Sequence, residues 1–318
     1  MKILIVCRLH GEHIAAFISE QADSLRQLGN EVRFVMADRG GGQGYWNMLS
    51  DIKKNISEWH PDVIHAHYGI SGLIANLQRQ VPVIVTYPGS DINELNKRPI
   101  SIMSMWLSRY NLVVSKRQLQ LVKRFVNLSK IQILRYGVML DVFYIQNKEE
   151  ARRRMGFEKD VKYVLFSSKF TRLGKDPDLA KSVVEVVNKR RCKDGRTNVQ
   201  LIPLNGEYTK EEMVTLMNAI DAAIVTSKKE GSPQFTKEVM ACGCPIVSVD
   251  VGDVAEQLEG VTGCGISKTR NADELADLLE QALEFQGRTN GREKLISENL
   301  SLEQTGKQLM KIYQRVIE

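Results

Sequence analysis

The sequence predicts an α/β protein built of two doubly wound, Rossmann-like domains, each a parallel sheet with helices on both faces. The first observation is the length, because 318 residues exceed the ~100–200 residues of one ordinary domain. The second is the alternation of short β-branched runs with amphipathic stretches, which is typical of parallel strands joined by crossover helices. The third is that the apolar runs are continuous, as strands covered on both faces require.

The first half of the chain carries six strand candidates and one clear helix. The helix is expected over Ile14–Leu28, where apolar residues recur at helical spacing, and Gly29 suits the position after its end. The strands are expected at Lys2–Val6, Val32–Met36, Val63–Ala66, Val83–Thr86, Leu112–Ser115 and Ile131–Leu134.

The second half repeats the scheme and ends in another helix. Its strands are expected at Tyr163–Ser167, Val199–Leu204, Ala222–Thr226 and Ile246–Val249. The polar segment 146–160 separates the halves, so we place one domain at 1–145 and the other at 146–300. The helix Leu302–Ile317, within 301–318, is expected to pack back toward the first domain. Ligands in such sheets bind beyond the carboxyl ends of the strands, so we expect two such edges to face a cleft.

Composition excludes several classes of protein. Hydrophobic residues at 43% and charged residues at 26% are ordinary globular values, unlike those of disordered, collagen-like or coiled-coil chains. No apolar run approaches the ~18 residues of a membrane-spanning helix, and no secretory apolar region follows Met1. The five cysteines are odd in number and scattered, so we expect a cytoplasmic protein. Cys242 and Cys244 are interpreted as small packing residues, with a metal or redox pair as the alternative.

The net charge of +6 is unevenly distributed. Residues 1–145 hold 17 basic and 11 acidic residues. No acid occurs between Leu95 and Leu140, where the basic residues are Lys97, Arg98, Arg109, Lys116, Arg117, Lys123, Arg124, Lys130 and Arg135. Such a surface attracts phosphates or anionic lipid headgroups; the alternative is a solvated face with counter-charges elsewhere. An apolar helix within Pro99–Tyr110 is expected to be buried, the alternative being a membrane-facing helix.

A segment in the second half combines a helix start with two carboxylates. Ser232 suits the N-cap, Pro233 the first helical position and Gly243 the position after the end. A short helix directly after a strand offers free backbone N–H groups to an anion. Glu230 precedes this helix and Glu238 falls inside it, where a carboxylate can accept hydrogen bonds from vicinal hydroxyls.

This segment resembles the Glu-x7-Glu signature of retaining GT-B glycosyltransferases, chiefly family 4. The likeness extends over nearly the whole chain, in order, through segments 61–67, 136–143, 221–227 and 245–252. The resemblance implies transfer of a sugar from a nucleotide-sugar with retained configuration. It implies that Glu238 holds the ribose hydroxyls. Glu230 and the backbone of Gly231, Ser232, Pro233, Gln234 and Phe235 would face the donor sugar.

A leaving nucleoside diphosphate needs positive charge, and the sequence offers side-chain cations for it. The loop Ser167–Lys175 resembles the family's Gly-Arg…Lys-Gly loop, with Ser168 for glycine, Lys169 for arginine and Lys175 offset by one residue. Lys169, Arg172 and Lys175 are therefore candidates for phosphate contact, and surface lysines are the alternative. Gly206 is a candidate near the base, and Gly11 of the first loop is a candidate near the donor phosphate.

The first domain departs from the family at one position. Val85–Asp91 resembles Thr-x-His-Gly-x-Asp, but Pro88 replaces the histidine, so either another group substitutes or activity is altered or lost. The acceptor-side candidates are His13, His67, Tyr87 and Asp91. The Gly-rich stretch 40–44 lacks a P-loop Lys-Ser/Thr and is interpreted as a flexible acceptor-side loop.

No metal or cofactor is expected. Asp176 and Asp178 have the spacing of a metal motif but suit a helix start, over Leu179–Asn188. A zinc site from His65, His67, His10 and His13 is the alternative. The sequence thus favours a metal-independent glycosyltransferase, hexosyltransferase-like, with a nucleotide-sugar (UDP-sugar first) as co-substrate.

Its expected acceptor is a glycan or lipid-linked molecule of polysaccharide biosynthesis. We expect the protein to be peripheral at the inner membrane face, on an anionic surface, without nucleic acid as a partner. A catalytically impaired nucleotide-sugar-binding scaffold is the alternative. A dinucleotide oxidoreductase is disfavoured because no Gly-x-Gly-x-x-Gly follows a strand. A periplasmic sugar-binding protein would need an export signal.

Overall fold

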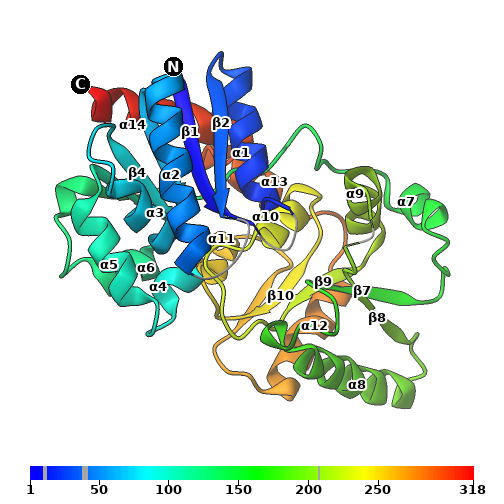
Figure 1. Ribbon diagram of the computed structural model, residues 1–318. Helices are drawn as coiled ribbons and strands as arrows, with labels where there is room; N and C mark the ends of the chain where they lie inside the picture. The colour runs from blue at the N-terminus through cyan, green and yellow to red at the C-terminus, as the bar shows by residue number, and fades with distance from the viewer. Residues whose placement is uncertain (10–12, 38–41, 207) are drawn as a thin grey trace. The chain divides into compact units, whose positions relative to one another are not determined.

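The computed structural model describes residues 1–9, 13–37, 42–206 and 208–318, and of Gly42 and Gln43 only the backbone. The chain forms two compact units (Figure 1). Unit 1 comprises Met1–Gly137 with Leu302–Glu318, and unit 2 comprises Val138–Ser301. The division after Gly137 falls earlier than the expected boundary after residue 145, because the chain around Val138 pairs with Leu300 and Ser301 of unit 2.

Unit 1 contains a six-stranded sheet, order β2-β1-β3-β4-β5-β6, and every pairing in it is parallel. Its strands are β1 (Lys2–Arg8), β2 (Glu31–Ala37), β3 (Val63–His67), β4 (Val83–Tyr87), β5 (Tyr110–Val113) and β6 (Ile131–Ile133). Its helices are α1 (Ala16–Gln27), α2 (Gly42–Trp59), α3 (Gly69–Asn76), α4 (Ser90–Asn93), α5 (Arg98–Leu107), α6 (Lys116–Val122), η1 (Leu128–Lys130) and α14 (Leu302–Ile317). All six predicted strands are present.

Two apolar clusters cover the two faces of this sheet. One combines side chains of α2 and α5 with alternate strand residues, and the other combines side chains of α1 and α14 with the remaining strand residues. Tyr313 of α14 is fully buried, and its hydroxyl lies 2.7 Å from Nδ1 of His65 on β3. The helix at the C-terminal end of the chain is therefore part of the core of unit 1.

Unit 2 contains a five-stranded parallel sheet, order β11-β10-β9-β7-β8. Its strands are β7 (Lys162–Phe166), β8 (Val199–Pro203), β9 (Ala222–Val225), β10 (Ile246–Val249) and β11 (Gly265–Ser267). Its helices are α7 (Lys148–Arg154), η2 (Leu173–Lys175), α8 (Pro177–Lys193), α9 (Lys210–Ala219), α10 (Gln234–Ala241), α11 (Val254–Leu258), α12 (Ala272–Glu284) and α13 (Gly291–Ser297). The four predicted strands are present, and the edge strand β11 was not predicted.

Several local expectations can be compared with this architecture. Gly29 has a φ of +82° just beyond α1, as a residue after a helix end requires. Cys242 and Cys244 are 0% and 1% exposed and belong to the apolar core of unit 2, which fits their interpretation as packing residues. Of the stretch 40–44, Gly40 and Gly41 lie outside the described residues, whereas Gly42 and Gly44 belong to α2, so the expectation of a loop is wrong for that part.

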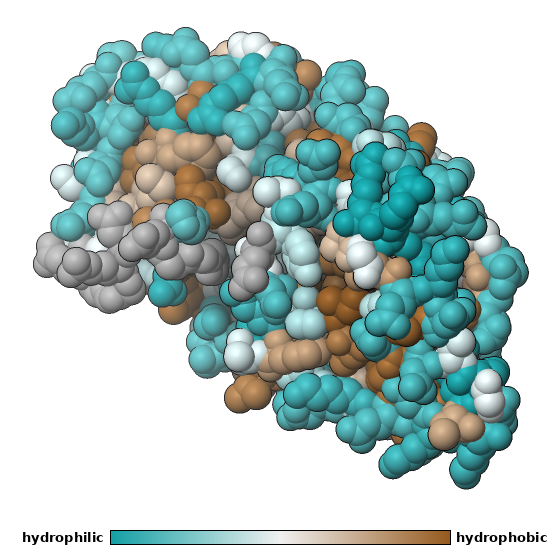
Figure 2. Space-filling model, turned by 90° about the vertical axis from the view of Figure 1, so that its right-hand side faces the viewer, coloured by the Kyte–Doolittle hydropathy of each residue, from teal (hydrophilic) through white to brown (hydrophobic). Residues whose placement is uncertain are grey.

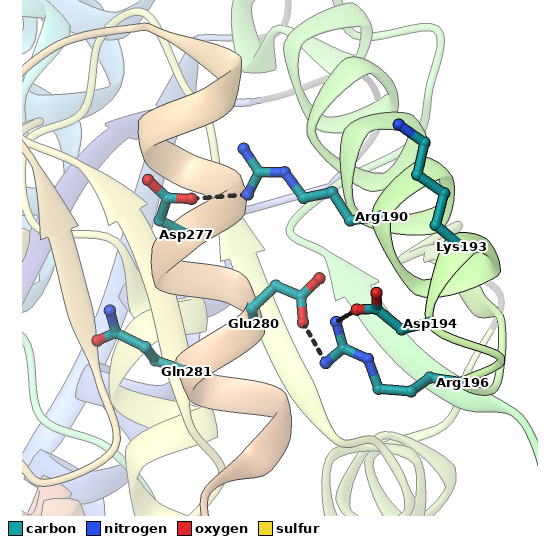
Figure 3. A pocket seen from close by; sticks show the side chains of 7 residues that line it. All are labelled: Arg190, Lys193, Asp194, Arg196, Asp277, Glu280 and Gln281. Carbon is teal, nitrogen blue, oxygen red and sulfur yellow. Dashed lines mark hydrogen bonds and ion pairs between the residues drawn. The ribbon is translucent and has the colours of Figure 1, made fainter.

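An open hollow of about 640 Å³ between α8 and α12 is lined almost entirely by charged residues (Figure 3). Arg190 donates to Asp277 at 2.6 Å, and Arg196 donates to Glu280 at 2.8 Å (Figure 3). Arg190 of α8 and Arg196, just beyond its end, thus pair with carboxylates of α12, so the hollow is lined by a structural ion-pair network.

The surface is mostly polar on the face drawn in Figure 2, with hydrophobic side chains gathered in separate patches. No helix within the described residues is both long enough and apolar enough to span a bilayer.

Candidate functional site

The strand order of unit 2 locates a ligand site before any side chain is considered. The chain runs outward from β7 to β8 on one side, and through β9, β10 and β11 on the other. The neighbours β7 and β9 therefore flank the point where the order reverses, and ligands of such sheets bind beyond the carboxyl ends of the strands there. Segment 167–175 follows β7 and segment 226–233 follows β9. These are the two segments that the sequence singled out.

Hydrogen bonds join these two segments. The Thr226 hydroxyl donates to the carbonyl oxygens of Lys175 and Asp176, at 3.0 and 2.8 Å. Asp176 has a left-handed φ of 54°, and Arg270, just before α12, donates to its carboxylate at 2.6 Å. Asp176 occupies the N-cap position of α8, which begins at Pro177, but its carboxylate pairs with Arg270 and makes no capping hydrogen bond. Sequence reasoning missed Arg270, since nothing local links it to a loop so far away in the chain.

Lys175 and Glu230 meet between these segments. Lys175 Nζ lies 2.5 Å from Glu230 Oε1, and the two side chains are 20% and 13% exposed. A partly buried carboxylate gains most from a cation at this distance, because little water screens the pair. Two of the three expected catalytic residues are thus in direct contact.

Lys169 is exposed beside a glycine turn. A Cβ added at Gly206 would lie 3.7 Å from Lys169 Cε, and Gly206 has a φ of +75°. The turn after β8 and the segment after β7 are therefore neighbours, as a shared site requires. Arg172 is exposed as well, and the described residues include no ion-pair partner for Lys169 or Arg172. Ser168, two residues after β7, is buried.

The helix α10 begins one residue later than predicted. Pro233 is its N-cap, with a ψ of 127°, and Gln234 is the first helical residue. Ser232 makes no cap because its hydroxyl accepts a hydrogen bond from Gln257 Nε2 at 3.2 Å. The predicted N-cap Ser232 and first helical residue Pro233 are therefore wrong by one position. The first-turn N–H groups of α10 still have no acceptor within the helix, so the anion-binding end is retained.

The remaining residues of the signature divide between core and site. Gly231 is buried in the loop, and Phe235 is 8% exposed in the apolar core, so Phe235 offers only its backbone. Gln234 and Glu238 are half-buried on α10. Glu238 thus retains some contact with solvent.

Three buried hydroxyls near this edge were not predicted. They have no hydrogen-bond partner among the described residues, and they belong to Ser167, Ser227 and Thr236. The first two follow the ends of β7 and β9, and Thr236 lies in the first turn of α10. Buried polar groups are normally paired, so these hydroxyls suit a polar ligand. The signal in the sequence is a serine one or two residues after an apolar strand.

Gly252 supports the loop from the neighbouring strand. It follows β10 with a φ of +60°, and a Cβ added there would lie 2.6 Å from the carbonyl oxygen of Gly231. Only glycine allows this approach. The turn after β10 therefore fixes the position of the Glu230–Gly231 backbone.

Unit 1 has a cavity of about 310 Å³ at the carboxyl ends of β1, β3 and β4. It includes the point between β1 and β3 where that sheet's order reverses. Its polar lining comes from Arg8, Tyr45, Tyr68, Ser90, Asp91 and Lys97. Asp91 accepts hydrogen bonds from the backbone N–H groups of Gly89 (3.1 Å) and Gly69 (3.2 Å). Burial raises the pKa of Asp91 to about 6.

Only one of the four acceptor-side candidates lines this cavity, and it is Asp91. Tyr87 is fully buried, and its hydroxyl donates to Ser104 (3.2 Å) and Asn111 (3.1 Å), so it supports the core. His67 is fully buried against Tyr136, with Nδ1 2.8 Å from the hydroxyl. Burial holds the pKa of His67 well below its usual range.

Other expectations lie elsewhere. His13 is exposed and is absent from the lining of the cavity. Gly11 and His10 lie outside the described residues. Both ring nitrogens of His65 are engaged, by Tyr313 and by Thr86. Among the residues placed by the structure, no three His, Cys, Asp or Glu side chains form a metal-binding group.

Comparisons with known proteins agree with this geometry. Residues 165–284 match the family model described as Glycosyl transferases group 1, and residues 7–120 match the model described as Glycosyl transferase 4-like. N-acetyl-alpha-D-glucosaminyl L-malate synthase of Bacillus anthracis is 23% identical over 249 residues, covering 69% of this chain and 65% of that protein. D-inositol 3-phosphate glycosyltransferase of Mycobacterium marinum is 25% identical over 247 residues, covering 65% and 53%. The chain thus spans less than two thirds of these relatives' length.

Solved structures share the fold at low identity. Sucrose-phosphate synthase from Thermosynechococcus elongatus has a TM-score of 0.79 at 15% identity, over 99% of both chains. Anabaena HepE in complex with UDP-glucose has a TM-score of 0.71 at 15% identity, over 99% of this chain and 100% of that one. Together with the two family models, which match well over half of the chain, these similarities establish that the protein belongs to the group 1 glycosyltransferases and has the GT-B fold.

Proposed function

We propose that this protein transfers a sugar from a nucleoside diphosphate sugar, with UDP-sugar as the first choice, and with retention of configuration. The acceptor is a glycan or a lipid-linked molecule of polysaccharide biosynthesis, and the reaction needs no metal ion. The observation that carries the proposal is the group at the carboxyl edge of unit 2, where Lys175 and Glu230 pair beside the start of α10.

The donor's diphosphate fits this group by charge. Its negative charge grows as the glycosidic bond breaks, and stabilisation of that charge is the main task of such a site. Lys169, Arg172 and Lys175 supply cations, and the first turn of α10 supplies N–H donors and a positive dipole end. Lys175 is neutralised by Glu230 before the donor binds, so the pair can exchange partners when phosphate oxygens arrive.

Glu238 is the proposed partner of the nucleoside. An ionised carboxylate accepts hydrogen bonds from two neighbouring hydroxyls, as the ribose presents them. Glu230, one loop earlier, faces the donor sugar. The backbone of Gly231 and of Ser232–Phe235 completes this side, with Ser168 and Gly206 near the phosphates and base. From the sequence, Gly11 is also proposed to lie near the donor phosphate.

The proposed acceptor site is the cavity of unit 1. Its aromatic rings, Tyr45 and Tyr68, suit the faces of sugars, and Arg8 suits an anionic group such as a phosphate. Asp91 lies in its wall as a hydrogen-bond acceptor for hydroxyls. We propose that the protein acts in the cytoplasm, peripherally at the inner membrane face.

Calorimetric titration with UDP, GDP and ADP tests the donor site. We expect micromolar binding of one of them by the wild type. Glu238→Gln should weaken it about 10- to 100-fold, since a hydrogen bond to a charged group contributes about 1.5–3 kcal/mol. Glu185→Gln on the exposed outer face of α8 is the matched control. Equal affinity of both variants, or no binding of any nucleotide, would refute the proposal.

A second candidate is a nucleotide-sugar-binding scaffold without catalysis. Pro88 favours it, because proline cannot titrate or donate a proton where relatives carry histidine. A panel of nucleotide-sugars separates the two, with release of nucleoside diphosphate measured in the presence of EDTA. Turnover above the uncatalysed rate excludes the scaffold, and binding without turnover excludes the enzyme.

A further inference from the structure

Helix α5 of unit 1 packs its small residues inward. Ser101 and Ser104 are 1% and 0% exposed and lie against Gly69 and Gly72 of α3. A Cβ added at Gly69 would lie 2.2 Å from Ser101 Oγ, and one at Gly72 would lie 2.4 Å from Ser104 Oγ. The two helices therefore approach at closest range through small side chains, which fixes the rotation of α5.

This rotation turns three large apolar residues of α5 outward, whereas Met105 remains in the core. Ile100, Met103 and Trp106 recur every third residue and are 38%, 48% and 63% exposed. Phe125 and Leu128, between α6 and β6, are 37% and 59% exposed. The Trp106 indole N–H donates to the carbonyl oxygen of Phe125 at 2.6 Å, so the two segments are adjacent. α5 therefore exposes more large apolar side chains than a surface helix usually does.

Cations surround these apolar side chains. A hollow of about 230 Å³ is lined by Trp106 together with Arg79, Arg109 and Lys130. The Arg124 guanidinium lies 4.7 Å from the centre of the Phe125 ring. None of these four basic residues has an ion-pair partner among the described residues, and the sequence between Leu95 and Leu140 contains no acid.

We propose that this surface docks onto a lipid bilayer that contains anionic lipids. We call it the α5 surface: Ile100, Met103, Trp106, Phe125 and Leu128 with Arg79, Arg109, Arg124 and Lys130. The apolar side chains enter the interfacial layer, where tryptophan is favoured. The cations contact lipid phosphates, and the hollow beside Trp106 accommodates a headgroup. A bilayer fits better than an ordinary protein partner. The cations require a broad negatively charged surface, and the apolar side chains require an apolar layer that they can enter.

The position of α5 gives this docking a purpose that rests on the proposed function. Ile100 lines the cavity of unit 1 and also belongs to the α5 surface. A bilayer along α5 therefore lies next to the cavity, so an acceptor anchored in the bilayer could enter without leaving it.

Vesicle flotation tests the proposal on the full chain. The wild type should bind vesicles of phosphatidylcholine with phosphatidylglycerol, bind pure phosphatidylcholine much less, and be released by salt. Arg124→Gln with Lys130→Gln should weaken binding about 25-fold, since each basic residue contributes about fivefold at such a surface. Lys53→Gln with Lys54→Gln, exposed on α2, is the charge-matched control and should bind as the wild type does.

Fluorescence quenching by bromolipids identifies the face that enters the bilayer. Trp46 is 69% exposed on α2, and Trp59 is buried. Trp46→Phe leaves Trp106 as the exposed reporter and should be quenched, whereas Trp106→Phe should not. Absent binding, equal binding by both double variants, or quenching of Trp46 alone would overturn the proposal. So would a dimer in solution that Trp106→Phe dissociates while vesicle binding is missing. Nucleotide affinity, measured separately, reports whether the proposed function fails independently.

Discussion

Replacing Gly252 by alanine tests whether the turn after β10 positions the Glu230–Gly231 backbone. Two costs are expected. The first is the left-handed conformation, φ +60°, which costs a residue with a Cβ about 1–2 kcal/mol. The second is the new contact, because the Cβ would lie 2.6 Å from the Gly231 carbonyl oxygen, whereas ordinary contacts begin at 3.4 Å.

The loop must therefore move by about 0.8 Å, the difference between these two distances. A misplacement of about 1 Å can cost about 100-fold in rate. We expect Gly252→Ala to reduce donor turnover about 10- to 100-fold. The free energy of unfolding should fall by more than about 2 kcal/mol, because the new contact adds to the cost of the left-handed conformation.

Gly260→Ala is the matched control. Gly260 also has a positive φ, +72°, but no atom lies within 4 Å of an added Cβ. The Gly260→Ala variant should therefore lose only about 1–2 kcal/mol of its free energy of unfolding, the cost of the left-handed conformation. Its donor turnover should be unchanged. Urea denaturation and the release of nucleoside diphosphate measure the two quantities. If both variants lose the same stability and the same activity, the turn does not support the loop.

Three further predictions concern contacts described above. Lys175→Met and Glu230→Gln should each destabilise the protein to urea, and the double variant should lose about 1–2 kcal/mol less than the sum, because the second change removes an already unpaired group; strict additivity would contradict the ion pair. Burial raises the pKa of Asp91 to about 6. The stability that its protonated form contributes is therefore full below pH 4 and is lost as the pH rises through 6, about 3 kcal/mol in all. The stability of Asp91→Asn relative to the wild type should rise over this window, and a constant difference would refute the raised pKa. Tyr313→Phe should cost about 1–3 kcal/mol, because it leaves Nδ1 of His65 buried without its partner; an unchanged urea midpoint would show that the bond does not hold α14.

The central strands of both sheets could be predicted because they are buried along nearly their whole length. β9 and the interior of β1 consist of continuous apolar residues, and burial on both faces leaves that pattern in the sequence. β11 was missed because it has three residues, Gly265–Ser267, of which only one is fully buried. An edge strand of this length is held by its pairing with β10 rather than by its own composition.

The candidate site was predictable segment by segment but not in its contacts. Lys175 and Glu230 were each expected at a strand end, but their pairing depends on which strands are neighbours. Ser232 was expected to be an N-cap because its local chemistry favours that position. In the structure its hydroxyl instead accepts a hydrogen bond from Gln257, which lies outside the segment. Both outcomes depend on tertiary structure.

The outward face of α5 shows the same limit. Its apolar residues suggested a buried helix, and that expectation is only partly right, since Ser101 and Ser104 take the buried positions. The rotation follows from glycines on α3, more than twenty residues earlier in the chain. No periodicity within α5 contains that information.

The position of α14 affects how the protein is made. Leu309, Ile312, Tyr313 and Val316 of this helix complete an apolar cluster whose other members come from the first 134 residues. During synthesis, the nascent first unit must therefore wait with one face of its sheet incompletely covered while all of the second unit emerges from the ribosome. The second unit has no such dependence, since its residues are continuous in the chain. Folding on the ribosome should then finish in the reverse of the order of translation, with the second unit native first.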